Sequence, residues 1–132
     1  MFSDYQSLYS STVLNLSWLA LTQIEAYTFD GLDNLQNLDL SYNQLSYIDA
    51  DAFRGLANLT ELQLNYNQLT YINVSTFSDL NSLEYLFLYG NQLTYLDSNI
   101  FNGLSKLNGL SLFSNQLESL PDTIFYGLSN LQ

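Results

Sequence analysis

A 24-residue repeat runs through almost the whole chain, and it constrains the fold more than any other feature. A repeat of roughly 20–29 residues, in which leucines alternate with polar residues before an asparagine, predicts a solenoid whose neighbouring coils share one core. The columns that recur at this step are Leu38, Leu62, Leu86 and Leu110; Leu40, Leu64, Leu88 and Leu112; and Phe29, Phe53, Phe77, Phe101 and Phe125.

The repeat organises the chain into one domain, residues 1–132, which is long enough to bury a sizeable core. Leu19 stands where the asparagine belongs in the first full copy, so that copy is degenerate. The predicted units are a partial repeat 1–10, the degenerate repeat 11–34, the regular repeats 35–58, 59–82, 83–106 and 107–130, and the start of another repeat at 131–132.

Each copy begins with a strand pattern. In Leu38-Asp39-Leu40 the leucines flank a polar residue, which predicts a short strand with one buried face. We expect parallel strands about 4.8 Å apart that line a concave surface, opposite a convex side that is irregular or 3-10 helical. The fold class is an α/β-type repeat solenoid, with strands centred on 14–16, 38–40, 62–64, 86–88 and 110–112.

An asparagine follows each regular strand, where the chain turns inward. Its amide can both donate to and accept from backbone groups that a parallel turn leaves unpaired. We therefore predict a structural ladder formed by Asn43, Asn67, Asn91 and Asn115.

The composition excludes several classes of function. The chain has thirteen acidic residues and only two basic ones, Arg54 and Lys106. The net charge of −11 argues against binding to nucleic acids or to anionic membranes. The chain has no Cys and no His, so we expect no metal site, no cofactor and no enzymatic activity. We also expect no membrane insertion, because no run of 18 apolar residues occurs.

Aromatic residues recur at positions that should point out of the strands or that directly follow them. Ser41 and Asn65 fall in the same column as Tyr89 and Phe113, so we expect them to point outward too. Exposed aromatic clusters are typical of binding surfaces. Cross-strand aromatic pairs also stiffen a sheet, so a purely structural role stays open. The candidate ligand-binding residues are Trp18, Tyr42, Tyr66, Tyr85, Phe87, Tyr89 and Phe113.

Three Asn-X-Ser/Thr motifs occur, at Asn15, Asn58 and Asn73. Chance alone gives a similar count in a chain this rich in Asn, Ser and Thr, so the count is no evidence of secretion. Asn15 and Asn58 lie beside inward leucines and should be accessible for N-glycosylation.

The combined pattern LxxLxLxxNQLxYIxxxxFxGLxN over about residues 11–132 resembles the 24-residue leucine-rich repeats of animal extracellular proteins. Toll-like receptors, Slit proteins, small leucine-rich proteoglycans and variable lymphocyte receptors carry such repeats. The resemblance implies a right-handed solenoid, an extracellular or cell-surface location, and binding of proteins or glycans rather than catalysis. Unlike those families, this chain has no cysteine-bonded caps, and the proline of the repeat occurs only as Pro121.

The predicted function is therefore a non-catalytic extracellular scaffold that binds protein or glycan through its concave face. The alternative is a structural protein whose uncapped ends associate head to tail into fibres, because core leucines should be exposed at both ends. These leucines are Leu14, Leu16, Leu128 and Leu131. It stays open whether the chain is such a fibre subunit or part of a longer array.

Overall fold

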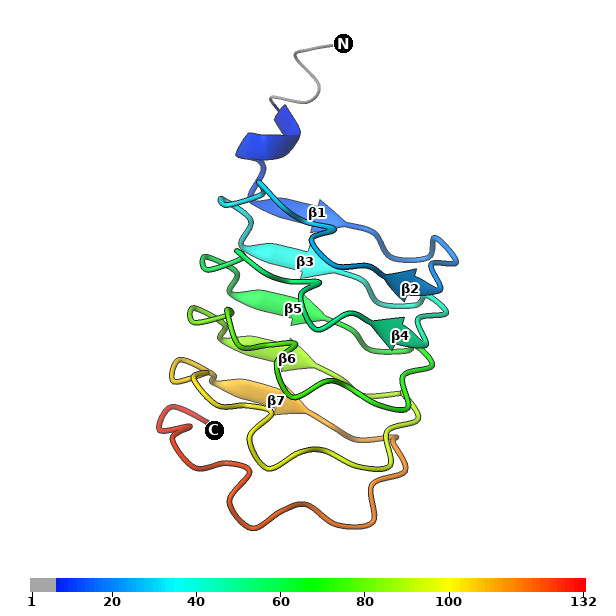
Figure 1. Ribbon diagram of the computed structural model, residues 1–132, viewed down its shortest axis with the longest axis vertical. Helices are drawn as coiled ribbons and strands as arrows, with labels where there is room; N and C mark the ends of the chain where they lie inside the picture. Colours follow the sequence, from blue (N-terminus) through cyan, green and yellow to red (C-terminus); the bar gives the residue numbers. More distant parts are fainter. Residues whose placement is uncertain (1–6) are drawn as a thin grey trace.

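The computed structural model describes residues 7–132, and residues 1–6 of the predicted partial repeat lie outside the described residues. Residues 7–10 are helical, and the chain then winds into coils stacked along one axis (Figure 1). No helix within 7–132 is long and apolar enough to cross a membrane.

The coils share a five-stranded parallel sheet, as the repeat predicts. Each strand pairs with the strand 24 residues later, so that Leu38 faces Leu62 and Leu62 faces Leu86. In spatial order the strands are β1 (Val13–Asn15), β3 (Asn37–Asp39), β5 (Glu61–Gln63), β6 (Tyr85–Phe87) and β7 (Gly109–Ser111).

Each of these strands begins one residue before the expected position. The first inward leucine, such as Leu62, lies at the centre of its strand, between two outward residues. Backbone pairing nevertheless continues to the second leucine, because the amide of Leu64 donates to the carbonyl of Phe87 over 2.9 Å. The expected segment is therefore paired throughout.

A second, two-stranded parallel sheet lies beside the first and was not predicted. It joins β2 (Gln23–Ile24) to β4 (Tyr47–Ile48), and Figure 1 shows it where the coils turn away from the main sheet. The rest of the convex side consists of turns, such as that in which the amide of Leu56 donates to the carbonyl of Phe53 over 3.3 Å.

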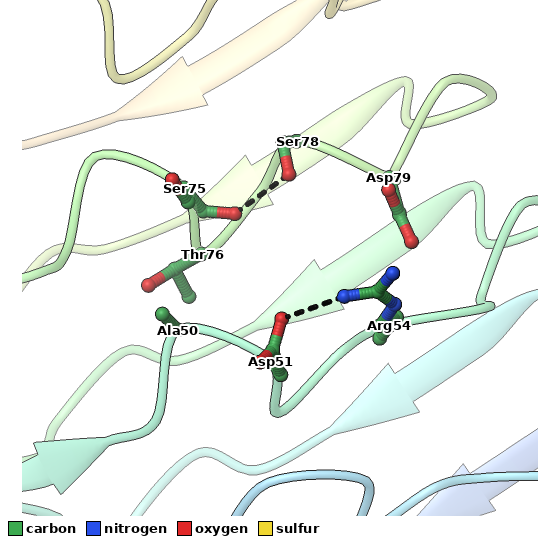
Figure 2. A pocket seen from close by; sticks show the side chains of 7 residues that line it. All are labelled: Ala50, Asp51, Arg54, Ser75, Thr76, Ser78 and Asp79. Carbon is green, nitrogen blue, oxygen red and sulfur yellow. Dashed lines mark hydrogen bonds and ion pairs between the residues drawn. The ribbon is translucent and has the colours of Figure 1, made fainter.

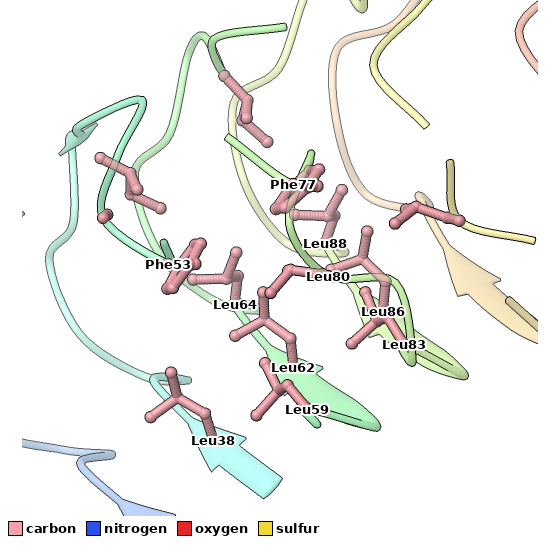
Figure 3. Close-up of a cluster of buried hydrophobic side chains, with 14 of the residues drawn as sticks. Leu38, Phe53, Leu59, Leu62, Leu64, Phe77, Leu80, Leu83, Leu86 and Leu88 are labelled. Atoms are coloured by element: carbon pink, nitrogen blue, oxygen red, sulfur yellow. The ribbon is translucent and has the colours of Figure 1, made fainter. Parts of the chain in front are cut away.

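The core runs along the solenoid between the main sheet and the convex turns (Figure 3). Leu62 and Leu64 are 0% exposed, as are their counterparts in the coils on either side. The Phe53 ring stacks between Phe29 and Phe77, with centroids 6.0 and 6.5 Å away. Phe125 departs from this predicted column: it is 42% exposed, because no further coil packs against it.

The leucines of the first and last coils are less protected than those within the array. Leu14, Leu16 and Leu131 are partly buried against the core. The expectation that Leu128 is exposed is wrong, since it is only 8% exposed and belongs to the core together with Ile124 of the same coil.

Candidate functional site

The asparagine ladder shapes the turn that follows each strand. The Asn67 carboxamide oxygen accepts from the amide of Leu45 over 3.0 Å, and its nitrogen donates to the carbonyls of Leu40 and Leu64 over 3.0 and 3.1 Å. Equivalent hydrogen bonds are made by Asn43, Asn91 and Asn115. These amides bond to backbone groups of two successive coils, which is a structural role.

The residue before each ladder asparagine, and Trp18 before Leu19 in the degenerate first copy, adopts a left-handed backbone. The φ angles are 60° at Trp18, 55° at Tyr42, 56° at Tyr66, 72° at Gly90 and 54° at Ser114. Only glycine adopts this conformation without strain, and bulky side chains are uncommon there. Three aromatic residues therefore occupy a position that disfavours them locally.

The rings at this position stack on one another along the solenoid. The centroids of Trp18 and Tyr42 are 4.3 Å apart with planes inclined by 8°, and those of Tyr42 and Tyr66 are 4.7 Å apart at 26°. These spacings match the distance of about 4.8 Å between neighbouring strands, so the sheet register sets the stack.

The stack changes column at the fourth coil. Tyr66 meets Tyr89 edge to face at 5.3 Å and 84°, and Tyr89 stacks on Phe113 at 4.5 Å and 8°. Phe87 contacts Tyr89 edge to face at 6.4 Å. We call Trp18, Tyr42, Tyr66, Phe87, Tyr89 and Phe113 the aromatic track.

Tyr85, the remaining candidate, lies apart from the track. No ring contact within the described residues joins it to another aromatic residue. Its hydroxyl accepts from the Asn108 side chain over 3.3 Å, and its ring covers Gly109, where an added Cβ would lie 2.8 Å from Tyr85 Cδ1. The structure thus brings six of the seven predicted aromatic residues together.

The track is exposed most at its two ends. Trp18 is 73% exposed and Phe113 is 61% exposed, whereas Tyr42 and Tyr66 are 38% and 44% exposed. An open groove of about 340 Å³ runs beside the stacked half, lined by Trp18, Ala20, Tyr42, Asn43, Gln44 and Tyr66.

Ser41 and Asn65 were predicted to point outward, but both are only 3% exposed. Both side chains are short, so larger neighbouring side chains can cover them. The Asp39 carboxylate accepts from the Ser41 amide and hydroxyl over 2.9 and 2.5 Å. The Asn65 carboxamide oxygen is buried without a hydrogen-bond partner.

Burial raises the pKa of the Tyr89 hydroxyl, and the charges of Tyr42, Tyr66 and Asp39 raise it further. Tyr89 therefore stays protonated at neutral pH and keeps a hydrogen-bond donor on this surface.

A smaller pocket of about 110 Å³ lies on the convex side (Figure 2). Arg54 pairs there with Asp51 at 3.2 Å, and Asp79 lies on the other side of the guanidinium. Thr76 lines the same pocket, and its hydroxyl is buried without a hydrogen-bond partner.

Lys106, the other basic residue, lines a third pocket together with Glu84. No group of three or more His, Cys, Asp or Glu within 7–132 is placed to hold a metal ion.

The glycosylation candidates have different surroundings. Asn15 is exposed, and its side-chain oxygen accepts from the amide and hydroxyl of Ser17. The Asn58 amide donates to the carbonyl of Asp33 over 2.8 Å, a bond between coils that the sequence analysis missed. Asn73 is half-buried, and its oxygen accepts from the amide of Ser75. Asn130, in the same column three coils later, makes the equivalent contact by donating to the carbonyl of Ser105.

A family model described as leucine rich repeat matches residues 10–69 and residues 57–117. No curated protein matches the chain in sequence.

Proposed function

Because the chain belongs to the leucine-rich repeat family, we propose that it is a non-catalytic extracellular scaffold that binds a partner protein through the aromatic track. The observation that carries this proposal is a continuous row of aromatic rings on the main sheet, of which Trp18, Tyr42, Tyr66 and Phe113 are exposed and Phe87 and Tyr89 are half-buried. Aromatic side chains are enriched at protein interfaces because they bury a large area and lose little conformational entropy.

The competing interpretation is that the rings only stiffen the sheet. Stacking accounts for the contact between Trp18 and Tyr42. It does not account for the exposure of Trp18 and Phe113, which leaves much of two large apolar side chains in water.

Along the middle of the track, a protein partner is favoured over a glycan. Tyr42 is stacked on both sides, by Trp18 and Tyr66, so its two ring faces are already covered. A sugar ring packs against a free aromatic face, whereas a protein surface can pack along the exposed ring edges and the groove beside them. A glycan remains the alternative ligand in the experiment.

The experiment compares two matched double variants against panels of purified extracellular proteins and glycans. Phe87→Ser with Tyr89→Ser removes the centre of the track, and neither residue belongs to the buried core. The control, Tyr47→Ser with Tyr71→Ser, removes two exposed tyrosines that lie outside the main sheet. Proteins bound by the wild type and the control but lost by the track variant support the proposal. Ligands that still bind the track variant as they bind the wild type contradict the proposal.

A second candidate function is head-to-tail self-association. Leu14 and Leu131 lie in the first and last coils and are only partly buried, and apolar surface at both ends of a stack is suited to an open chain of copies. Leu131→Asp should then dissolve assemblies that electron microscopy detects for the wild type. Monomers of the wild type at every concentration would eliminate this candidate.

A further inference from the structure

We propose that Asn102 is a site of spontaneous deamidation, and that pairing within the main sheet protects Asn108 from the same reaction. Each of the two asparagines begins the tripeptide Asn-Gly-Leu. An asparagine before glycine is especially prone to deamidation, because glycine has no Cβ to obstruct attack by its own amide nitrogen. The local sequence is the same at both sites, so any difference in their reactivity comes from the fold.

The reaction requires only water and hydroxide. The Gly103 amide nitrogen, once it has lost its proton, attacks Cγ of Asn102 and closes a cyclic imide, while the Asn102 side-chain nitrogen leaves as ammonia. Water then opens the imide at either carbonyl, which yields aspartate or isoaspartate with one added negative charge and no change in oxidation state. The attacking nitrogen must therefore be free of strong hydrogen bonds and able to reach the preceding side chain.

Asn102 meets these conditions in a turn of the convex side, where it and Gly103 are both exposed. Within residues 7–132 no protein atom accepts a hydrogen bond from the Gly103 amide, whereas the amides on either side donate to the carbonyls of Asn99 and Phe101 over 3.0 and 3.2 Å. A Cβ built on Gly103 would have only Asn81 Oδ1 within 4 Å, at 3.9 Å, so the imide has space to close.

Asn108 lies directly before β7 and is held by the preceding coil. The amides of Asn108 and Gly109 both donate to the carbonyl of Glu84, over 2.8 and 3.0 Å. The Asn108 side chain donates to the Tyr85 hydroxyl over 3.3 Å, and the Tyr85 ring covers Gly109. On the other side, the Gln132 amide donates to the Asn108 carbonyl over 2.9 Å. The attacking nitrogen becomes free only when this part of the sheet opens, which costs free energy.

The positions of the two sites give the modification different consequences. Deamidation of Asn102 adds a negative charge to a turn outside the main sheet and leaves the aromatic track unchanged. An isoaspartate at Asn108 would lengthen the backbone where it pairs with Glu84, at the start of the strand that leads to Phe113. The fold therefore confines the reaction to the convex side.

Trypsin separates the two sites, because it cleaves after Arg54 and Lys106. Asn102 then lies in peptide 55–106, and Asn108 lies in peptide 107–132. Deamidation adds about 1 Da, and fragmentation of each peptide in the mass spectrometer assigns that gain to one asparagine.

The experiment incubates the folded full chain at mildly alkaline pH beside a sample unfolded in guanidinium chloride. We expect the folded chain to deamidate Asn102 at least about tenfold faster than Asn108, because only the second site must open first. The unfolded chain should deamidate the two sites at rates within about threefold of each other, since their local sequences match.

Two variants test the cause of the difference. Asn102→Gln keeps an exposed amide but lengthens the side chain, which disfavours ring closure, so the mass gain at position 102 should disappear. Tyr85→Phe removes the hydroxyl that Asn108 contacts and keeps the backbone pairing, so Asn108 should stay within about twofold of its rate in the wild type.

The inference is overturned if the folded chain deamidates both sites equally, deamidates Asn108 faster, or leaves Asn102 intact while the unfolded chain reacts. A mass gain that persists in Asn102→Gln would place the reaction at another residue. If Asn108 in Tyr85→Phe reacts as fast as Asn102, the side-chain contact, and not the sheet, provides the protection.

Discussion

The ring of Tyr66 occupies the space beside Gly90 in which any larger residue would place its side chain. A Cβ added at Gly90 would lie only 2.7 Å from Tyr66 Cδ1 and 2.9 Å from Tyr66 Cε1. Gly90 stands in the column of Trp18, Tyr42 and Tyr66, so the stack ends there and the track continues through Tyr89. The bend in the track therefore depends on the absence of a side chain at one position.

Gly90→Ala should destabilise the protein and alter the tyrosine signal in near-ultraviolet circular dichroism. The left-handed backbone costs about 1–2 kcal/mol for a residue with a Cβ, and displacement of the Tyr66 ring adds to this. Gly55→Ala is the control, because Gly55 has φ +86 but nothing within 4 Å of an added Cβ. Equal losses of unfolding free energy in the two variants would show that the ring contact contributes nothing.

Leu64→Ala should lower the free energy of unfolding by about 2–5 kcal/mol, because it leaves a cavity in a core shared by neighbouring coils. Leu112→Ala makes the same change at a partly buried leucine two coils later and should cost less. Denaturant titration measures both. A larger loss for Leu112 would contradict the burial gradient along the solenoid.

Asn67→Ala should cost about 1–3 kcal/mol although it removes no apolar area, because the amide of Leu45 and the carbonyls of Leu40 and Leu64 lose their partner. The neighbouring Gln68→Ala changes an exposed side chain and should stay within about 0.5 kcal/mol of the wild type. An unchanged thermal melt for Asn67→Ala would show that water replaces the amide.

Stability should fall in alkaline solution, partly because of Tyr89. Its pKa is raised above 10.0 in the folded protein, first by burial, so the unfolded state releases this proton at lower pH. The contribution is fully present below pH 10.0 and is lost as the pH rises through the folded pKa. Tyr89→Phe should therefore lose less unfolding free energy over this range than the wild type. Parallel profiles for the two proteins would contradict the prediction.

Passage through a eukaryotic secretory route should add glycans to one or more of Asn15, Asn58 and Asn73. The intact mass should then fall when each Asn is changed to Gln. A glycan on Asn15 would cover β1 beside Trp18 and direct partners towards the later coils. An intact mass equal to that of the bare polypeptide would remove this support for an extracellular role.

Much of the fold followed from periodicity. The inward leucines, the parallel strands and the phenylalanine stack were predictable, because each coil packs only against its neighbours and repeats their contacts. The second sheet was not, because Tyr47-Ile48 pairs with Gln23-Ile24 while the equivalent Tyr71-Ile72 forms no strand.

The candidate site divides in the same way. The sequence by itself determined that Trp18, Tyr42 and Tyr66 fall in one column, and a register of 24 residues then stacks their rings. It did not determine that Ser41 and Asn65 are buried. The tertiary structure decided this, together with the turn of the track towards Tyr89 and Phe113, because side-chain rotamers and the space above a single glycine are local quantities that a repeat pattern does not specify.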